Sequence, residues 1–198
     1  VVGGENGGER TDLEIYDPAT DSWTTGSSMP TARQSLALGA IDGKLYALGG
    51  DHNGILSTLE IYDTATNVWT TGPSMSIMRR SLVVGVVDGK LYAVGGHDAS
   101  SQVATLEIYD PATNAWTTGS AMPTARDYLA AAVIDGKFYV IGGQTGVTPG
   151  AVLEIYDPST NAWTTGPSMP SARETLAACA IGGKLYVVGG LNDGPALN

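Results

Sequence analysis

The 198-residue sequence contains one cysteine, one phenylalanine and only half as many basic residues as acidic ones. Cys179 alone cannot form a disulfide within the chain, and it offers none of the paired spacings typical of zinc sites. No apolar run approaches the roughly 18 residues that cross a bilayer, and the N-terminus lacks the basic and apolar regions of a signal peptide. A P-loop, a dinucleotide-binding fingerprint and a nucleophile elbow are missing too, which argues against several common enzyme classes.

What the sequence does have is a repeat. Its four tryptophans recur at intervals of 46, 47 and 47 residues, and Gly-Gly pairs and Tyr-Asp dipeptides follow the same grid. Such a period indicates an array of equivalent structural units. We therefore divide a single domain, residues 1–198, into four units that cover residues 5–50, 51–96, 97–143 and 144–190.

Within a unit the apolar residues alternate with a period of two in short segments that end at turn residues, which predicts four antiparallel strands. Residues 35–41 and 44–48 predict two strands joined by a tight turn at Asp42-Gly43. Residues 58–63 and a segment around Trp69 predict two more. The chain opens on Val-Val-Gly-Gly, which reads as the end of a strand, so we expect it to begin inside a unit.

The order of these signals resembles the kelch repeat. An apolar run ends in Gly-Gly, then come Tyr-Asp, a tryptophan and Met-Pro-x-x-Arg, as in residues 45–50, Tyr109-Asp110, Trp116 and residues 122–126. The resemblance covers nearly the whole chain. It implies an all-β fold, a β-propeller built from four-stranded antiparallel blades.

Residues that recur in every unit are best explained by folding and packing against the next unit. We interpret the tryptophan and tyrosine columns as core between blades. A small-residue column, which ends in Cys179, is expected where inner strands converge. Four glutamates could pair with four arginines and hold a third strand to the start of the next first strand: Glu14, Glu60, Glu107 and Glu154 with Arg33, Arg79, Arg126 and Arg173.

Sorting the charges by whether they repeat separates framework from function. The repeated columns hold eight basic and eleven acidic residues, so they account for only −3 of the formal net charge of −10. Nearly all the remaining acids lie between the second and third strands or just before a first strand, positions that leave a blade at the same end. We therefore expect one acidic face. Its acids are Glu5, Glu9, Asp12, Asp51, Asp98, Asp127, Glu174 and Asp193.

This face is the candidate binding site, because kelch proteins commonly bind partners with these loops and length variation in repeats tends to map there. The residues are Gln34, Ser35, Asp51, His52, Arg80, Ser81, His97, Asp98, Asp127, Tyr128, Gln144, Glu174 and Thr175. An acidic surface favours a basic protein segment or a glycan, and it disfavours nucleic acid and anionic membranes. We expect a non-catalytic binding module that requires neither a cofactor nor a metal.

Two other functions remain open. His52 and His97 each neighbour an aspartate in adjacent units, so a propeller enzyme is the alternative, either a metal-assisted hydrolase or a sugar-modifying enzyme such as a mutarotase. A structural array without a ligand is the third.

Ring closure is a separate question, because the strands predict half a blade at each end of the chain. The two halves could join within one chain as a mixed terminal blade, giving four blades, or between chains, giving a larger homo-oligomeric ring. A piece of a longer kelch protein is a further possibility. We expect one of the two closed rings.

Overall fold

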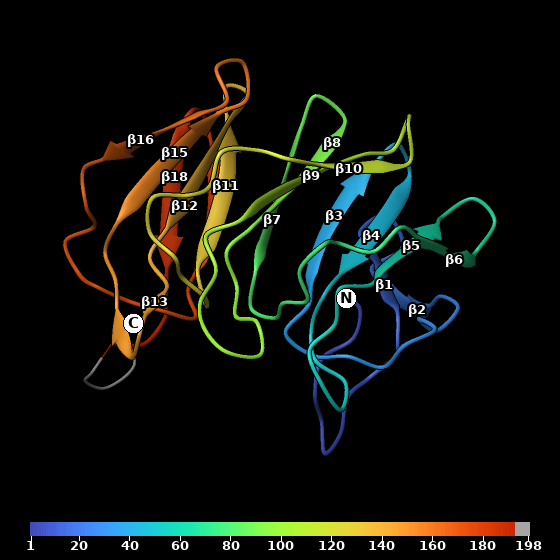
Figure 1. The fold of residues 1–198 in the computed structure, drawn as a ribbon. Coiled ribbons are helices and arrows are strands. Elements are labelled where there is room, and N and C mark those ends of the chain that lie inside the picture. The colour runs from blue at the N-terminus through green and yellow to red at the C-terminus, as the bar shows by residue number, and fades with distance from the viewer. Residues whose placement is uncertain (193–198) are drawn as a thin grey trace.

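The computed structural model describes residues 1–192. Every regular element in this range is a β-strand, so the described residues include no helix that could cross a membrane. Three four-stranded antiparallel sheets stand side by side along an arc, with a two-stranded sheet at each end (Figure 1). The blades of the kelch propeller that the sequence predicts are thus confirmed.

Each full blade contributes its strands in chain order. Blade 1 comprises β3 (Ala37–Ile41), β4 (Lys44–Leu48), β5 (Leu59–Asp63) and β6 (Val68–Gly72); blade 2 comprises β7 (Val83–Val87), β8 (Lys90–Val94), β9 (Leu106–Asp110) and β10 (Ala115–Thr118); blade 3 comprises β11 (Ala130–Ile134), β12 (Lys137–Ile141), β15 (Leu153–Asp157) and β16 (Ala162–Gly166). A small hairpin of β13 (Gln144–Thr145) and β14 (Thr148–Pro149) projects from blade 3.

The two half-blades do not meet. The N-terminal half-blade is β1 (Glu14–Asp17) with β2 (Ser22–Thr25), and the C-terminal half-blade is β17 (Ala177–Ile181) with β18 (Lys184–Val188). They form separate sheets, so the mixed terminal blade expected within one chain is not present in the described residues. Each half-blade packs on its neighbouring full blade, but within residues 1–192 its sheet has only two strands.

The strand register follows from the turns. Asp42 and Gly43 both have positive φ, 47° and 73°, as a two-residue type I′ hairpin requires. This turn pairs Ile41 with Lys44 and, at the other end of the hairpin, Ala37 with Leu48. Because the side-chain period of a strand is two, the register sends one set of apolar residues into each inter-blade space.

The core lies between blades and is dominated by aromatic and branched side chains. Tyr46 of blade 1 packs on Tyr109 of blade 2 with ring centroids 5.9 Å apart, and both are almost fully buried. A Cβ on Gly39 would lie only 2.4 Å from a methyl carbon of Leu91 in the next blade. The small-residue column is therefore needed for close approach of adjacent blades, but Cys179 is exposed because no blade follows it.

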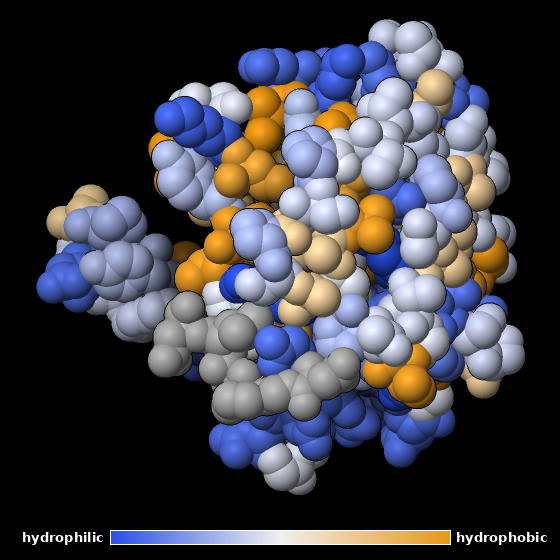
Figure 2. All heavy atoms as spheres, turned by 90° about the vertical axis from the view of Figure 1, so that its left-hand side faces the viewer, coloured by the Kyte–Doolittle hydropathy of each residue, from blue (hydrophilic) through white to orange (hydrophobic). Residues whose placement is uncertain are grey.

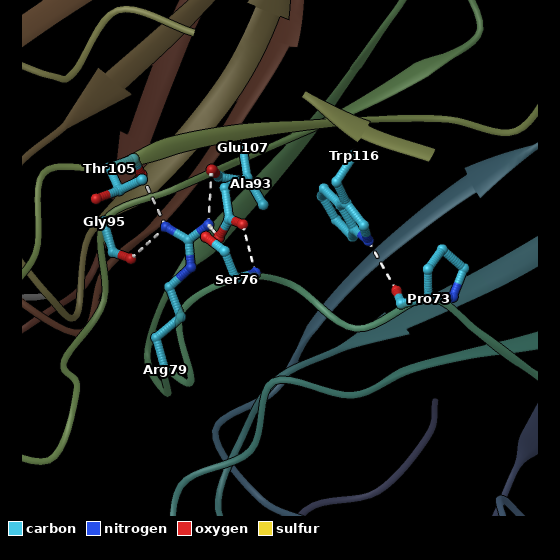
Figure 3. A network of polar contacts seen from close by, with 8 residues as sticks. All are labelled: Pro73, Ser76, Arg79, Ala93, Gly95, Thr105, Glu107 and Trp116. Atoms are coloured by element: carbon cyan, nitrogen blue, oxygen red, sulfur yellow. Dashed lines mark hydrogen bonds and ion pairs between the residues drawn. The ribbon is translucent and has the colours of Figure 1, made fainter. Parts of the chain in front are cut away.

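A buried arginine lies beside one end of the second and third strands in each full blade. The Arg79 guanidinium donates to the carbonyl oxygens of Ala93, Gly95 and Thr105, at 3.3, 3.2 and 2.7 Å, and to Glu107 Oε2 at 2.7 Å (Figure 3). Arg33 and Arg126 pair with Glu60 and Glu154 at 2.7 and 2.6 Å. All three arginines are completely shielded from solvent. We call this arrangement the arginine clasp.

The clasp corrects the pairing expected from sequence. Each arginine pairs with a glutamate of its own blade, one unit further along the chain, so the ion pair ties the segment before a first strand to the third strand of the same sheet. Glu14 and Arg173, at the two ends, are consequently left without their ion-pair partners in the described residues.

The Gly-Gly pairs join this clasp to the preceding blade. The Gly50 N–H donates to the Arg79 carbonyl oxygen at 3.0 Å. The same oxygen lies 2.3 Å from where a Gly49 Cβ would be, and Gly49 has a φ of 59°. The first glycine therefore leaves room for the arginine carbonyl oxygen, and the N–H of the second glycine donates a hydrogen bond to it.

Breaking a clasp should destabilise the fold strongly. Glu107→Gln leaves the buried Arg79 charge without its counter-ion, and removing one partner of a buried pair costs about 3–5 kcal/mol. Glu14→Gln is the matched control, because Glu14 occupies the same position in the exposed N-terminal half-blade. Urea unfolding at low protein concentration should show a large loss of unfolding free energy for Glu107→Gln and little change in it for Glu14→Gln. Equal losses would contradict the role assigned to the clasp.

Acid should lower the stability of the fold over a defined pH range. Hydrogen bonds from Ser159 and the ion pair with Lys137 lower the pKa of Asp157 from 3.8 to about 2. A carboxyl group with a lowered folded-state pKa contributes stability above its unfolded pKa and loses it as pH falls. Between pH 3.8 and 2, the urea midpoint of Asp157→Asn should therefore fall less than that of wild type. Asp17→Asn, the equivalent change in the N-terminal half-blade, should leave the profile unaltered.

Candidate binding site at the axial mouth

One end of the arc brings together the two loop sets that the sequence singled out. The residue after each of the four repeated arginines, Arg33, Arg79, Arg126 and Arg173, forms an antiparallel bridge with the residue after the Gly-Gly pair of the same blade or half-blade. The bridges are Gln34 with Asp51, Arg80 with His97, Asp127 with Gln144, and Glu174 with Leu191. These paired positions form a rim, and we call the region that they surround the axial mouth.

Inside the rim, four equivalent residues are linked by a continuous chain of backbone hydrogen bonds around the axis. The Ser81 N–H donates to the Ser35 carbonyl, the Tyr128 N–H to that of Ser81, and the Thr175 N–H to that of Tyr128, at 2.9, 3.2 and 2.8 Å. All four residues have left-handed backbones with φ of 50–52°. This conformation is strained for a residue such as Tyr128 or Thr175, and such strain concentrates at functional sites.

These four residues and the leucines that follow them line a shallow hollow of about 280 Å³. Leu82 and Leu129 are almost fully buried and form part of its floor. Polar and aromatic side chains therefore surround an apolar base. The leucines were not among the predicted site residues, although their column directly follows the predicted positions and could have been read from the repeat.

Two rim residues from neighbouring blades neutralise each other. Arg80 Nη1 donates to Asp51 Oδ2 at 2.7 Å, with the two side chains 40% and 18% exposed. The Gly54 N–H also donates to Asp51 Oδ1 at 3.3 Å. Asp51 therefore orients Arg80 and fixes its own loop, and the pair contributes no net charge to the mouth.

Asp127 differs from the other rim acids because it is buried, with 3% of its surface exposed. Its Oδ1 accepts from Gln102 Nε2 at 3.3 Å, and Gln102 also donates to the Gly146 carbonyl. Burial raises the pKa of Asp127, against the opposing effects of Gln102, His97 and Arg80. Gln102 was missed from the sequence, although it lies in a loop that is one residue longer than in the first two units.

Asp98 mainly holds its own loop. Its Oδ1 accepts from the backbone N–H groups of Ser100 and Ser101 and from the Ser100 hydroxyl, and these bonds lower its pKa. His97 Nδ1 contacts the Asp98 backbone carbonyl rather than a carboxylate. The carboxylate-oriented histidine that a general base requires is therefore not formed at His97.

The remaining predicted residues lie at the rim without forming a metal site. His52 bonds through its backbone to Gly54, and its Nδ1 is buried without a hydrogen-bond partner. Across residues 1–192, no three His, Cys, Asp or Glu side chains are grouped so that they could hold a metal ion. His52, His97 and their aspartates therefore do not form a ligand cluster. Asp193 lies outside the described residues.

Taken together, the antiparallel blades, the joints between them and the polar mouth define an arc of a β-propeller. The family model described as the KLHDC2/KLHL20/DRC7 Kelch-repeats domain matches residues 1–190. The chain therefore belongs to the kelch-repeat family.

A solved structure supports the fold. The structure titled "Structure of YjhT" superposes with a TM-score of 0.83 at 19% sequence identity, over 96% of this chain and 71% of that one. No curated protein matches the sequence.

The burial of Asp127 predicts a specific pH dependence. A carboxyl group whose folded-state pKa is raised costs stability as pH rises through that pKa, because its charged form is the poorly solvated one. Asp127→Asn should therefore be more stable than wild type at pH 7, and the two should converge as pH falls towards 3.8 and below. Urea midpoints measured across this range test it. A less stable variant at pH 7 would indicate instead that a cation offsets the Asp127 charge.

Proposed function

We propose that this kelch array is a non-catalytic binding module whose axial mouth takes a basic segment of a protein partner. The observation that carries the proposal is the mouth itself: a hollow built on four left-handed residues, with a buried carboxylate at its rim. Kelch domains generally mediate protein interactions, which favours a protein ligand.

Charge supports a basic ligand. Glu5, Glu9, Asp12, Asp51, Asp98, Asp127 and Glu174 belong to the loops of this end, against only Arg10 and Arg80. The two arginines pair with Asp12 and Asp51, so neither forms an ion pair with Glu5, Glu9, Asp98 or Asp127. A cationic side chain that enters the mouth would compensate the buried Asp127 charge, and this gain grows as water is excluded.

The size of the hollow limits what can enter it. At about 280 Å³ it lies just below the range of small-molecule pockets, roughly 300–1,000 Å³. It suits one or two side chains of a bound segment rather than an enclosed cofactor. The surrounding rim would contact the rest of that segment through its polar side chains.

A glycan is the second candidate ligand, and Tyr128 is the observation that favours it. Its side chain lies at the hollow with the residue 37% exposed, so its ring could stack on a sugar while Gln34 and Gln144 bind hydroxyl groups.

Binding of a short oligolysine peptide, followed by calorimetry at two salt concentrations, tests the main proposal. The affinity should fall with salt, and Asp127→Asn with Glu174→Gln should weaken it by at least about tenfold, since even solvent-exposed charge contacts contribute roughly 0.5–1 kcal/mol each and Asp127 is buried. Asp42→Asn with Asp88→Asn, a matched charge change in two hairpin turns at the opposite ends of the strands, should leave it unaltered. If both pairs of substitutions weakened peptide binding equally, the mouth would be ruled out as the binding site. Binding on a glycan array that is lost in Tyr128→Ala would favour the sugar.

A further inference from the structure

The two ends of the arc expose surfaces that are buried at every internal joint. On β17 and β18, Ile181, Tyr186 and Val188 are 62%, 49% and 65% exposed, whereas their equivalents in blade 1, Ile41, Tyr46 and Leu48, are at most 7% exposed. Hydrophobic surface lies among hydrophilic patches on the side of the molecule drawn in Figure 2. The C-terminal half-blade thus exposes the apolar face that the next blade covers at an internal joint.

The N-terminal half-blade presents the opposite face. Tyr16 and Trp23 are 44% and 61% exposed, whereas Tyr109 at the equivalent position of blade 2 is 2% exposed. A hollow of about 480 Å³ is lined by Glu14, Trp23, Thr24 and Thr25. At the other end, Arg173, Leu185 and Val187 help to line a hollow of about 330 Å³. Each end therefore has a cavity beside one half of an arginine clasp.

Two other contacts occur in all three full blades. For a fourth copy of each, the two partner residues lie at opposite ends of the arc. Lysine–aspartate pairs link the second and third strands, Lys44–Asp63, Lys90–Asp110 and Lys137–Asp157, at 3.3, 3.0 and 2.9 Å. The fourth pair would be Lys184 with Asp17. Tryptophan Nε1 atoms donate to the carbonyls of Ser27, Pro73 and Ser120 in the preceding unit. The fourth donor is Trp23, and the equivalent carbonyl belongs to Pro167.

We propose that two copies of this chain associate head to tail, with β18 of one copy pairing antiparallel with β1 of the next to form a composite four-stranded blade. The register follows from blade 3, where Phe138 faces Tyr156 and Val140 faces Glu154. The same offset places Leu185 opposite Tyr16 and Val187 opposite Glu14 of the second copy. Arg173 then completes a clasp with that Glu14, and Lys184 pairs with Asp17.

The N-terminal residues show how β18 would fit. Val1 exchanges hydrogen bonds with Glu14, and Val2 bridges to Leu13, so Val1-Val2-Gly3-Gly4 already occupies part of the second-strand position beside β1. Val187-Val188-Gly189-Gly190 has the same four residues. Docking replaces one such segment by the other and adds the contacts of Lys184, Leu185 and Tyr186, for which the N-terminal segment has no equivalents.

Gly189 supplies a further sign that a neighbour is missing. At Gly3, Gly49, Gly95 and Gly142 a Cβ would meet the carbonyl oxygen of the next blade's arginine at 2.3–2.8 Å. At Gly189, which has the same left-handed φ, no atom of the described residues lies within 4 Å of such a Cβ. Docking would place the Arg33 backbone of the second copy there, in continuity with the internal joints.

A second copy fits this surface better than the chain's own other end. In the described residues the two half-blades form separate sheets, and the superposed region covers only 71% of the YjhT chain. Such head-to-tail contacts produce closed rings or open chains of copies, depending on the rotation between them.

Light scattering of the 198-residue chain tests the proposal. Wild type should show masses that are multiples of 20.4 kDa and rise with concentration. Arg173→Glu and Glu14→Arg each place like charges at every junction, so each alone should associate at least ~100-fold more weakly. An equimolar mixture of the two should recover association, because every junction between different variants is then complementary. Arg10→Glu, a matched charge reversal in a loop, should behave like wild type.

Cys179 provides a second measurement, because it is the only thiol and lies on the face that docking covers. Its labelling by a thiol reagent should slow at least tenfold in assembled wild type and stay fast in Arg173→Glu. A 20.4 kDa species at all concentrations would overturn the proposal, with slow labelling then indicating closure of the chain on itself. Undiminished association of both single variants would also overturn the proposal, and so would a failure of their equimolar mixture to recover association. Thermal unfolding confirms that each variant is folded.

Discussion

The structure depends on three guanidinium groups that are completely removed from water. A buried charge is tolerated only when its hydrogen bonds and its counter-charge are supplied, and Arg79 obtains both from the second and third strands of its own blade. Its backbone carbonyl is in turn held by Gly50 of the preceding blade. One residue per unit thus fixes the order of strands within a blade and the joint between blades.

The same constraint explains how the mouth can vary without disturbing the fold. Gln34, Arg80 and Asp127 each directly follow a clasp arginine, so their backbone positions are set by buried contacts that do not involve their own side chains. The next residue in each unit adopts the left-handed conformation and continues the bond chain around the axis. A fixed backbone therefore presents side chains that differ from unit to unit.

Sequence reasoning found the blades because their signals are local. Alternating apolar residues, the Asp-Gly turns and the Gly-Gly pairs each dictate their own conformation, and β4 lies where it was predicted. Pairing between columns is not local. The distance along the chain from each arginine to the preceding glutamate, and that to the following one, hardly change from unit to unit. The period therefore identified both columns but could not show that Arg33 pairs with Glu60 rather than with Glu14.

Features that break the repeat were the hardest to predict. Asp127 is buried and accepts a hydrogen bond from Gln102 of another loop, neither of which the position of Asp127 in its unit reveals. Tyr16 and Trp23 were assigned to the core with their columns, yet both are exposed because burial in a repeat array depends on the neighbour. The identity of a residue in the repeat indicates what it can pack against, and its place in the array decides whether that partner is present.

The ends of the arc and its mouth are physically connected through the left-handed residues. Within the described residues, the bond chain begins at the Ser35 carbonyl and ends at the Thr175 N–H. A second copy docked on β18 would bring its own Ser35 N–H to the Thr175 carbonyl, which extends the chain and enlarges the mouth with another set of rim residues. A ligand that spans the junction would bind the assembled form more tightly than the single chain. By linkage, that ligand would then favour assembly to the same degree.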